Sequence, residues 1–404
     1  MDKFASNLMP FLRANHQTMV AQLHQFCEIN SSSDNLPGLS LMHDALRKAF
    51  SPLTDTIESR VLPSISTIDM SGNQLQQNCG DVLFLRKRPH IKHRILLSGH
   101  MDTVYSSNHP FQQLKFIDDN RVNGPGVADM KGGLVVMLHA LSAFESTPYA
   151  ATLGWDVLIN ADEEMGSPAS GPLFAELSAN YQAALVYEPT MTAQGTFAKN
   201  RRGSGKITLI ATGKAAHAGR AFDEGRNAIC FLAEAITAIH ALNGQREGVT
   251  INVGLISGGE ALNVVPDKAV TKLDVRISQP SDELWVREQL ATIVTKMTSK
   301  DYTLTIHGGF GRPVKRVNTA TEQLFSRVHQ IGKTLGLMID WQDSGGCCDG
   351  NNLAAAGLPV LDTLGVRGGD IHSSNEFILL DSLVERAALS ALLMVEFAQE
   401  GKSL

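Results

Sequence analysis

Acidic and imidazole side chains recur in this chain where apolar segments run into turns marked by glycine or proline. Histidine nitrogens and carboxylate oxygens are the ligands with which proteins hold Zn²⁺ and similar divalent ions. Two histidines with three or four carboxylates, placed at the carboxyl ends of sheet strands, would provide a hydrolytic site for two metal ions. The candidates are His100, Asp129, the pair Glu163 and Glu164, Glu188 and His372.

The first candidate follows an apolar segment that begins at Arg94 and is expected to end as a strand at Gly99. Side chains alternate along a strand, so His100 and Asp102 project to the same side. A carboxylate in that place can accept the second ring N–H of a metal-bound histidine and fix its tautomer. The alternative is a surface histidine beside a turn aspartate.

The second candidate, Asp129, lies among glycines and a proline between Gly124 and Gly133, directly before an apolar helix. This run lacks the Gly-Lys-Ser/Thr ending of a phosphate-binding loop, so we reject nucleotide binding. At the start of the helix, the two oxygens of Asp129 could bridge two cations. The same aspartate could instead only cap the helix.

The paired glutamates end an apolar strand that begins at Trp155. Successive residues of an extended chain face different ways, so one glutamate can bind metal while the other faces the substrate. Paired acids at such a strand end are unfavourable to bury without a counter-cation, and the alternative is that they are solvated. Glu188 repeats the strand-end pattern, and His372 taken alone is an ordinary loop residue. The conjunction of five strand-end placements favours the metal site.

Composition narrows the class of protein. The chain has 404 residues, 43% of them hydrophobic, which allows a large core and roughly two to three domains. A formal charge of −6, without a basic run interleaved with aromatics, argues against a nucleic-acid partner. Polar residues interrupt the apolar stretch near the N-terminus, so we expect no membrane span and a cytoplasmic enzyme. Five cysteines without C-x-x-C spacing support neither a disulfide framework nor a thiolate zinc site.

The pattern of strands and helices predicts how these residues are positioned. Alternation in the first part implies a sheet covered by helices on both faces. From about Arg202, the order strand, helix, two strands, helix, strand is typical of a split βαβ domain, and the first rhythm resumes beyond Pro313. We therefore expect a discontinuous catalytic domain, residues 1–201 and 314–404, and an inserted domain, residues 202–313. The elements expected in the first part are a helix at Met9–Ile29, strands at Asp81–Leu85 and Arg94–Gly99, a helix at Gly132–Phe144, a strand at Trp155–Asn160, a helix at Gly171–Ala179 and a strand at Ala183–Tyr187. Beyond Pro313 the expected elements are a helix at Thr319–Leu335, a strand at Met338–Trp341, a helix at Gly350–Ala356, a strand at Pro359–Leu364 and a helix from Asp381 to about Gln399.

Five sequence strings together resemble a known family. The strings are Ser-Gly-His-Met-Asp-Thr-Val (98–104), Gly-Pro-Gly-Val-Ala-Asp-Met-Lys-Gly-Gly (124–133), Asp-Glu-Glu-Met-Gly-Ser (162–167), Tyr-Glu-Pro-Thr (187–190) and Ile-His-Ser (371–373). From about residue 8 onward, the chain resembles the M20 metallopeptidases, and within them the glutamate carboxypeptidase (carboxypeptidase G2-like) branch.

The resemblance implies a fold, a cofactor and roles for the candidates. The fold is α/β: a phosphorylase/hydrolase-like α/β/α catalytic sandwich with a mixed sheet, plus an inserted ferredoxin-like lid through which a homodimer forms. The cofactor is two divalent ions, Zn²⁺ first, with Co²⁺ or Mn²⁺ as alternatives. One ion would be held by His100, Asp129 and Glu188 and the other by Asp129, Glu164 and His372, with Glu163 as the general base and Asp102 orienting His100.

Further implied roles fall in and next to the inserted segment. His217 is implied to reach the partner subunit's active site and stabilise the oxyanion. Asn263, Arg276 and Arg312 are implied to grip the substrate's α-carboxylate, which arginine can bind with paired hydrogen bonds, although Arg276 could equally lie on a solvated face. One departure is Ala198–Gly203, which is more basic than in glutamate-specific members. Its arginines serve either an acidic substrate or a solvated linker, and we favour the linker.

The function implied is metal-dependent hydrolysis of an amide bond in small peptides or N-acyl amino acids that bear a free carboxylate. An alternative is a deacylase of acylated metabolites, of the acetylornithine or succinyl-diaminopimelate type, and another is an aminopeptidase of short peptides. A non-catalytic binding protein on this scaffold would be expected to lack the base or a ligand. All of these residues are present, which disfavours it.

Overall fold

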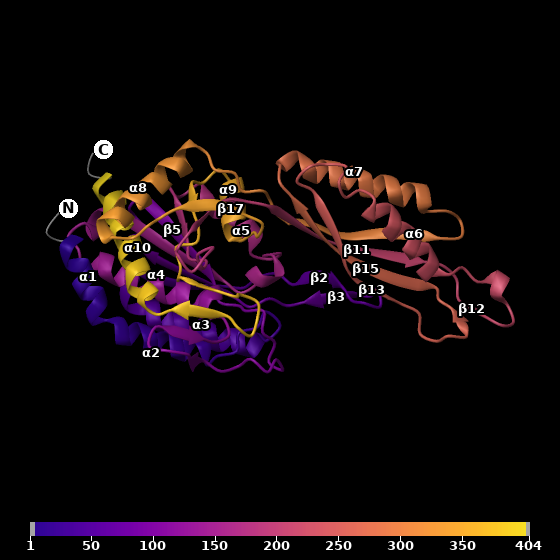
Figure 1. Ribbon diagram of the computed structural model, residues 1–404, viewed down its shortest axis with the longest axis horizontal. Helices are drawn as coiled ribbons and strands as arrows, with labels where there is room; N and C mark the ends of the chain where they lie inside the picture. Colours follow the sequence, from indigo (N-terminus) through magenta and orange to yellow (C-terminus); the bar gives the residue numbers. More distant parts are fainter. Residues whose placement is uncertain (1–4, 401–404) are drawn as a thin grey trace.

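The computed structural model describes residues 5–400 and shows an elongated molecule with a larger body and a smaller one projecting from it (Figure 1). A six-stranded sheet forms the centre of the larger body, the main domain. β5 runs parallel to β8 and β9, and β4 runs antiparallel to β8, so the sheet is mixed as expected. Its order is β1 (Thr56–Arg60), β4 (Val82–Lys87), β8 (Gly154–Asn160), β5 (Arg94–His100), β9 (Ala184–Val186) and β18 (Val360–Leu361).

Helices cover both faces of this sheet, because its strands alternate apolar side chains to either side. Leu83 and Leu85 of β4 belong to one core cluster, whereas Val82 and Phe84 belong to the opposite one. The α/β/α sandwich is therefore confirmed. The first face carries α1 (Ala5–Ala14), α2 (His16–Cys27), α3 (Leu36–Phe50), α4 (Gly132–Glu145), α8 (Thr319–Leu335) and α10 (Asp381–Glu400), and the second carries α5 (Gly171–Ser178) and α9 (Asp349–Ala355).

Helix α4 and the turn before it are unusually apolar. Within the described residues, the stretch Val127–Glu145 is long and apolar enough to cross a membrane by length and composition alone. In the fold, 94% of that window is buried, and α4 packs against α10 and β5. It is the core helix of the main domain.

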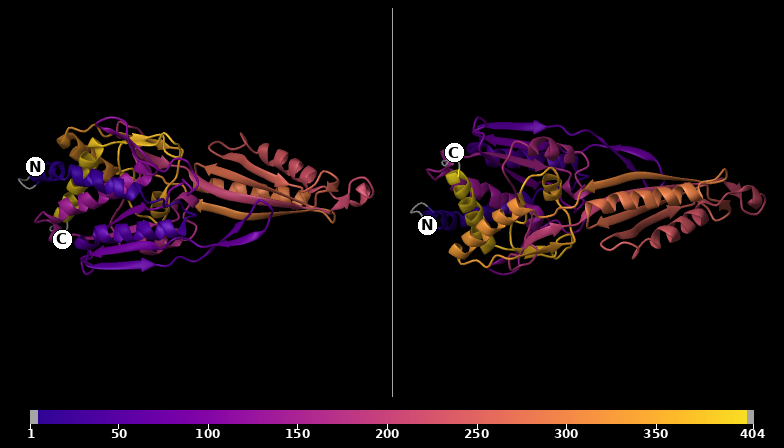
Figure 2. Two further views of the ribbon diagram at one scale, coloured as in Figure 1. Left: turned by 90° about the horizontal axis from the view of Figure 1, so that it is seen from below. Right: turned by 90° about the horizontal axis from the view of Figure 1, so that it is seen from above.

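The smaller body, here called the inserted domain, is formed by the elements from β11 to β16. Its four strands pair antiparallel in the order β13, β15, β11, β16, and its two helices pack on one face, which confirms the split βαβ pattern. It projects along the long axis of the molecule (Figure 2). The elements are β11 (Gly203–Thr212), α6 (Ala228–His240), β13 (Thr250–Gly258), β15 (Lys268–Ile277), α7 (Pro280–Met297) and β16 (Thr303–Arg312), with the short pair β12 (Ala216–His217) and β14 (Val264–Val265). The boundaries 201/202 and 313/314 stay a prediction.

Smaller sheets connect these parts. A hairpin of β2 (Ile65–Ile68) and β3 (Gln74–Gln77) leaves the main domain and reaches the inserted one (Figure 1). Another sheet, near the candidate site, has the order β19, β20, β7, β6. Its strands are β6 (Lys115–Phe116), β7 (Arg121–Asn123), β19 (Gly368–Gly369) and β20 (Phe377–Leu379), while β10 (Phe197–Arg201) pairs with β17 (Trp341–Ser344).

Three local expectations need correction. The single helix expected over Met9–Ile29 is two helices, because Asn15 ends α1 and its side chain donates to the Phe11 carbonyl. Helix α3 was not anticipated, although Asn35 caps it by accepting from the Gly38 N–H. The expected strand at Met338–Trp341 begins only at Trp341, as β17, and it pairs outside the central sheet.

Candidate metal centre

The predicted ligands meet at the carboxyl ends of β5, β8 and β9, as strand ends of a parallel arrangement must. His100 Nε2 lies 3.0 Å from Asp129 Oδ1 and 3.9 Å from Glu188 Oε1. On the other side, His372 Nε2 lies 3.3 Å from both Asp129 Oδ2 and Glu164 Oε2. The structure thus brings all five side chains together as two ligand triads that share Asp129.

The donor set fits two divalent cations. Each triad offers one imidazole nitrogen and two carboxylate oxygens within 4.8 Å of one another, the mixed N/O set that suits Zn²⁺ and its neighbours. Glu164 Oε1 is buried and has no hydrogen-bond partner within residues 5–400. A buried carboxylate oxygen without a partner is unfavourable unless a cation or solvent satisfies it. Two ions, one on either side of Asp129, match this arrangement.

Without cations, charge in the centre is poorly balanced. Burial, with repulsion from Asp129, raises the pKa of Glu164 to about 8, and burial raises that of Glu188 well above its usual range. Although burial alone would raise it, the pKa of Asp129 is lowered because His100 and His372 hydrogen-bond to it. The hydrogen bonds to Asp129 and Glu164 raise the pKa of His372 to about 11. The carboxylates outnumber the available positive groups.

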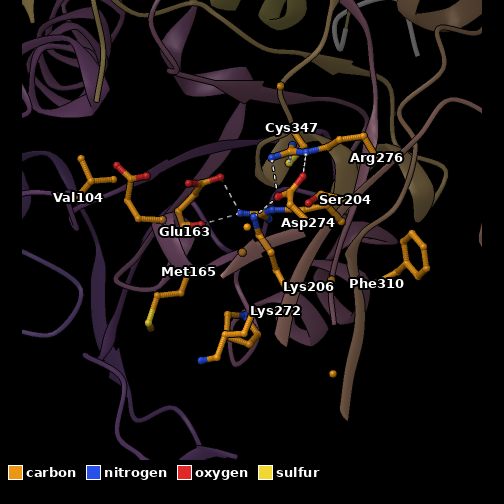
Figure 3. Close-up of a pocket in the computed structure, with 18 of the residues that line it drawn as sticks. Val104, Glu163, Met165, Ser204, Lys206, Lys272, Asp274, Arg276, Phe310 and Cys347 are labelled. Atoms are coloured by element: carbon orange, nitrogen blue, oxygen red, sulfur yellow. Dashed lines mark hydrogen bonds and ion pairs between the residues drawn. The ribbon is translucent and has the colours of Figure 1, made fainter. Parts of the chain in front are cut away.

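Asp102 links the first histidine to the paired glutamates. Its Oδ1 lies 3.2 Å from His100 Nδ1, as alternation along the strand predicted. Its two oxygens also accept the backbone N–H groups of Glu163 and Glu164, at 3.2 and 3.1 Å. One buried carboxylate thereby orients His100 and fixes the turn after β8, where Figure 3 shows Glu163.

Glu376 is a positioning residue that the sequence analysis missed. It is fully buried and accepts the backbone N–H groups of Ala128 and Asp129 at 2.8 and 3.0 Å. Tyr105 also donates to it at 2.6 Å. Glu376 therefore holds the loop that presents Asp129. Its only sequence signal was its position four residues after His372.

The proposed base, Glu163, is held by Arg312 rather than left free. Arg312 Nη2 donates to Glu163 Oε1 at 2.6 Å, and its other nitrogen pairs with buried Asp349. Burial raises the pKa of Glu163 to about 7, against the opposing charge of Arg312. Since Arg312 is only 2% exposed and engaged on both sides, its binding of a substrate carboxylate stays a prediction.

The other predicted substrate residues separate into two places. Arg276 lines the same cavity as Glu163, and it pairs with Asp274 at 2.7 Å while its Nη1 meets Cys347 Sγ at 3.5 Å (Figure 3). His217 ends β12 and pairs with Val264, the first residue of β14. Asn263 directly precedes β14, and its carbonyl accepts the Ala218 N–H. Neither His217 nor Asn263 belongs to the cavity lining.

The basic segment Ala198–Gly203, most of which lies within β10, is not a solvated linker, contrary to the interpretation favoured from the sequence. Arg201 is buried, and its Nε and Nη2 donate to Asp362 at 3.0 and 3.1 Å. Lys315 donates to the same carboxylate at 2.6 Å. Arg201 is buried because β10 pairs in parallel with β17, where Arg201 lies opposite Ser344.

A cavity of about 1560 Å³ opens from the metal ligands toward the inserted domain. Its walls include Asp129, Glu163 and His372 of the main domain and Lys206 and Lys272 of the inserted domain. Figure 3 shows Glu163, Lys206 and Lys272 around this cavity. The side chain of His372 is 51% exposed, so the centre is accessible from this cavity. A small peptide or acylated amino acid has room between the two bodies.

Comparison with known proteins agrees with this geometry. Carboxypeptidase G2 of Pseudomonas sp. (strain RS-16) is 27% identical over 311 residues, which are 75% of this chain and 73% of that protein. A putative succinyl-diaminopimelate desuccinylase DapE of Mycobacterium tuberculosis (strain ATCC 25618 / H37Rv) is 30% identical over 222 residues, 52% of this chain and 58% of that protein. The structure of the Bacillus subtilis YXEP protein, described as a dinuclear metal-binding peptidase, has a TM-score of 0.65 at 13% identity and covers 96% of this chain and 99% of that one.

A family model also matches most of the chain. The model of peptidase family M20/M25/M40 matches residues 96–396. That range includes every proposed metal ligand, the proposed base and the whole inserted domain. The chain belongs to peptidase family M20/M25/M40 and is a metal-dependent hydrolase of amide bonds.

Proposed function

We propose that this enzyme binds two Zn²⁺ ions and cleaves the amide bond of small peptides or N-acyl amino acids that carry a free α-carboxylate. The observation that carries the proposal is the pair of ligand triads joined by Asp129. His100 and Glu188 complete one triad, and Glu164 and His372 complete the other. Zinc is preferred over Co²⁺ and Mn²⁺ because imidazole and carboxylate together suit a borderline ion.

The reaction divides between the ions and the protein. Ions bound at this centre would lower the pKa of a water between them and polarise the scissile carbonyl. Glu163 takes the proton from the attacking water and then passes it to the leaving amine. Arg312 holds the carboxylate of Glu163 at 2.6 Å, which keeps the base oriented toward the cavity. The products are an amine and a carboxylate.

Residues of the inserted domain bind the rest of the substrate. Arg276 lines the cavity, and among the described residues its Nη1 donates only to the weak acceptor Cys347 Sγ, so it can take a carboxylate oxygen. His217 and Asn263 lie outside the cavity of their own chain. We therefore assign them to the site of a second copy, which makes the enzyme a homodimer through the inserted domain, acting in the cytoplasm. Sedimentation of the purified protein as a monomer at micromolar concentration would contradict this assembly.

A second candidate activity is the removal of an acyl group from an acylated metabolite. The similarity to the DapE relative favours it, since that protein's name describes a desuccinylase. Both activities break an amide next to a carboxylate with the same metal centre. They differ in whether the acyl part is a peptide or a simple acid.

Metal-loaded protein tests both candidates in one screen. Hydrolysis is measured on N-acyl amino acids, on dipeptides and on dipeptides with blocked N-termini, with the metal content of each preparation determined in parallel. We expect turnover of blocked substrates and loss of turnover in Glu163→Gln with metal retained. Failure of the fully loaded wild type on every amide would contradict the proposed function. Turnover by Glu163→Gln at the wild-type rate would remove Glu163 as the base.

A further inference from the structure

The face of the inserted sheet that turns away from its helices forms one wall of the cavity. Ile207 and Leu209 of β11 pack beneath α6 and α7. Side chains alternate along a strand, so Lys206 and Thr208 point to the opposite face of the sheet. Directly paired residues of antiparallel strands share a face. Thr208 pairs with Lys272, and Lys272 pairs with Leu255 on the next strand. Lys206, Thr208, Leu255 and Lys272 all line the cavity.

Charged side chains on this open face lie in successive rows, where a row is a set of residues that pair directly across neighbouring strands. Arg276 lies in the row nearest Arg312, because both pair with Ser204. Asp274 comes next and forms ion pairs with Lys206 and Arg276. Lys272 lies one row further, and its ammonium group has no ion pair or hydrogen bond within residues 5–400. The wall is therefore positive overall, and Lys272 is its uncompensated charge.

The hairpin of β2 and β3 closes the far end of this wall. Ile68 joins Ile210 and Val270 in a small apolar cluster that covers the row beyond Lys272. At its other end, the hairpin contacts the turn of the proposed base, since Gln77 Nε2 lies 3.4 Å from Met165 Sδ. The open stretch of the wall thus runs from Arg276 to Lys272 and stops there.

We propose that Lys272 binds a second carboxylate of the substrate, so that the enzyme prefers amides whose acyl part is long and ends in an acid. This rests on the proposed function, in which Arg276 takes the α-carboxylate. Arg276 and Lys272 are four positions apart on one strand, so their backbone positions are about 13 Å apart at roughly 3.3 Å per residue. Both lie on β15, so movement of the inserted domain leaves their separation unchanged.

The separation of Arg276 and Lys272 indicates which part of the substrate carries the second carboxylate. An extended chain advances at most about 3.6 Å per residue, so a span of about 13 Å needs a segment of several residues or an acyl chain of that length. The side chain of one acidic C-terminal residue is too short to bridge it. The second carboxylate therefore belongs to the far end of the acyl part.

Kinetics on matched N-acyl-L-alanines test the subsite. The substrates are N-suberoyl-L-alanine, whose long acyl chain ends in a carboxylate, its neutral ω-amide, and the short N-succinyl-L-alanine with its ω-amide. Wild type should favour the suberoyl acid over its amide about tenfold in kcat/KM, which is about 1.4 kcal/mol, with a smaller preference in the succinyl pair. In Lys272→Met, the suberoyl ratio should fall to about one through KM, and in Lys272→Glu it should invert.

The ratio between two substrates within one variant cancels any loss of folded protein. Lys296→Met, an exposed lysine of α7 away from the cavity, is the matched control and should keep the wild-type ratio. An unchanged ratio in Lys272→Met overturns the subsite while hydrolysis itself still supports the proposed function. A preference for N-acetylglutamate over N-acetylglutamine that depends on Lys272 would also overturn it, because it places the acid on the C-terminal residue. Hydrolysis of none of these amides by metal-loaded wild type contradicts the proposed function and the subsite with it.

Discussion

The metal centre and the open face of the inserted sheet bound the same cavity but are built differently. In the centre, most side chains are buried and held by second partners, as Asp102 and Glu376 hold His100 and the Asp129 loop. On the open face, Lys206 is 64% exposed and Lys272 has no partner within the described residues. Groups held by several partners suit a bond-breaking step that needs fixed geometry, whereas exposed groups without partners stay available to bind different substrates.

Replacing Asp129 should have the largest effect, because both triads depend on it. In Asp129→Asn, one of the two ligand oxygens and the negative charge are lost, so we expect less than one tightly bound metal ion and activity at background. Metal analysis after dialysis, paired with a hydrolysis assay, measures both. Two retained ions with normal turnover would show that the triads are not joined as described.

Removing the base should leave the metal in place. Glu163→Gln keeps the size of the side chain and its contact with Arg312, so kcat is expected to fall by about 10²- to 10⁴-fold with two ions bound. Glu176→Gln, an exposed glutamate on α5, is the matched control and should behave as wild type. A fall confined to KM would move Glu163 from proton transfer to binding.

Positioning residues should show intermediate effects. Glu376→Gln leaves the Asp129 loop with a weaker acceptor for its N–H groups, so metal affinity or activity is expected to fall about 10- to 100-fold. Competition with a chelator measures the affinity, and excess metal should restore part of the activity. If affinity and turnover both match wild type, the loop is held by other contacts.

The smallest expected effect concerns stability of the main domain and its dependence on pH. Burial lowers the pKa of His139 on α4 to about 4, and its Nε2 lies 3.1 Å from Gln22 Oε1. The unfolded chain, with an ordinary pKa near 6.5, binds more protons between these values. The stability is therefore full above pH 6.5 and is lost as the pH falls toward 4.

Urea unfolding at pH 7.5 and pH 5 measures this contribution. The loss of unfolding free energy between the two pH values should be smaller in His139→Leu than in wild type, by about 2 kcal/mol. His240→Leu, an exposed histidine of the inserted domain, should leave the difference unchanged. Equal losses in all three proteins would mean that the fold does not lower the pKa of His139.

Features with a regular pattern could be predicted from the sequence, namely side chains that alternate along a strand and polar residues that follow strand ends. Alternation placed Asp102 beside His100, and the strand-end pattern brought Glu188 and His372 into one centre. The sequence could not predict contacts made by residues without a local pattern, such as Glu376 holding the Asp129 loop. The same holds for Arg201, whose basic neighbourhood suggested solvent until the pairing of β10 with β17 placed it against Asp362.

Some helices and strands could be predicted from the sequence and others could not. The βαβ rhythm and the split βαβ insertion followed from periodicity, and α8 matches its predicted range, Thr319–Leu335. The hairpin of β2 and β3 is polar and short, so its pattern predicted nothing, and only the fold shows that it reaches the inserted domain. Long-range packing, rather than local propensity, decides such elements.

The most direct test of the account is the number and position of metal ions in the enzyme. A crystal structure of zinc-loaded protein, with anomalous scattering measured across the zinc edge, should show two ions per chain with Asp129 between them. His100 and Glu188 should ligate one ion, and Glu164 and His372 the other. A single ion that does not touch Asp129, or two ions bound elsewhere, would contradict it.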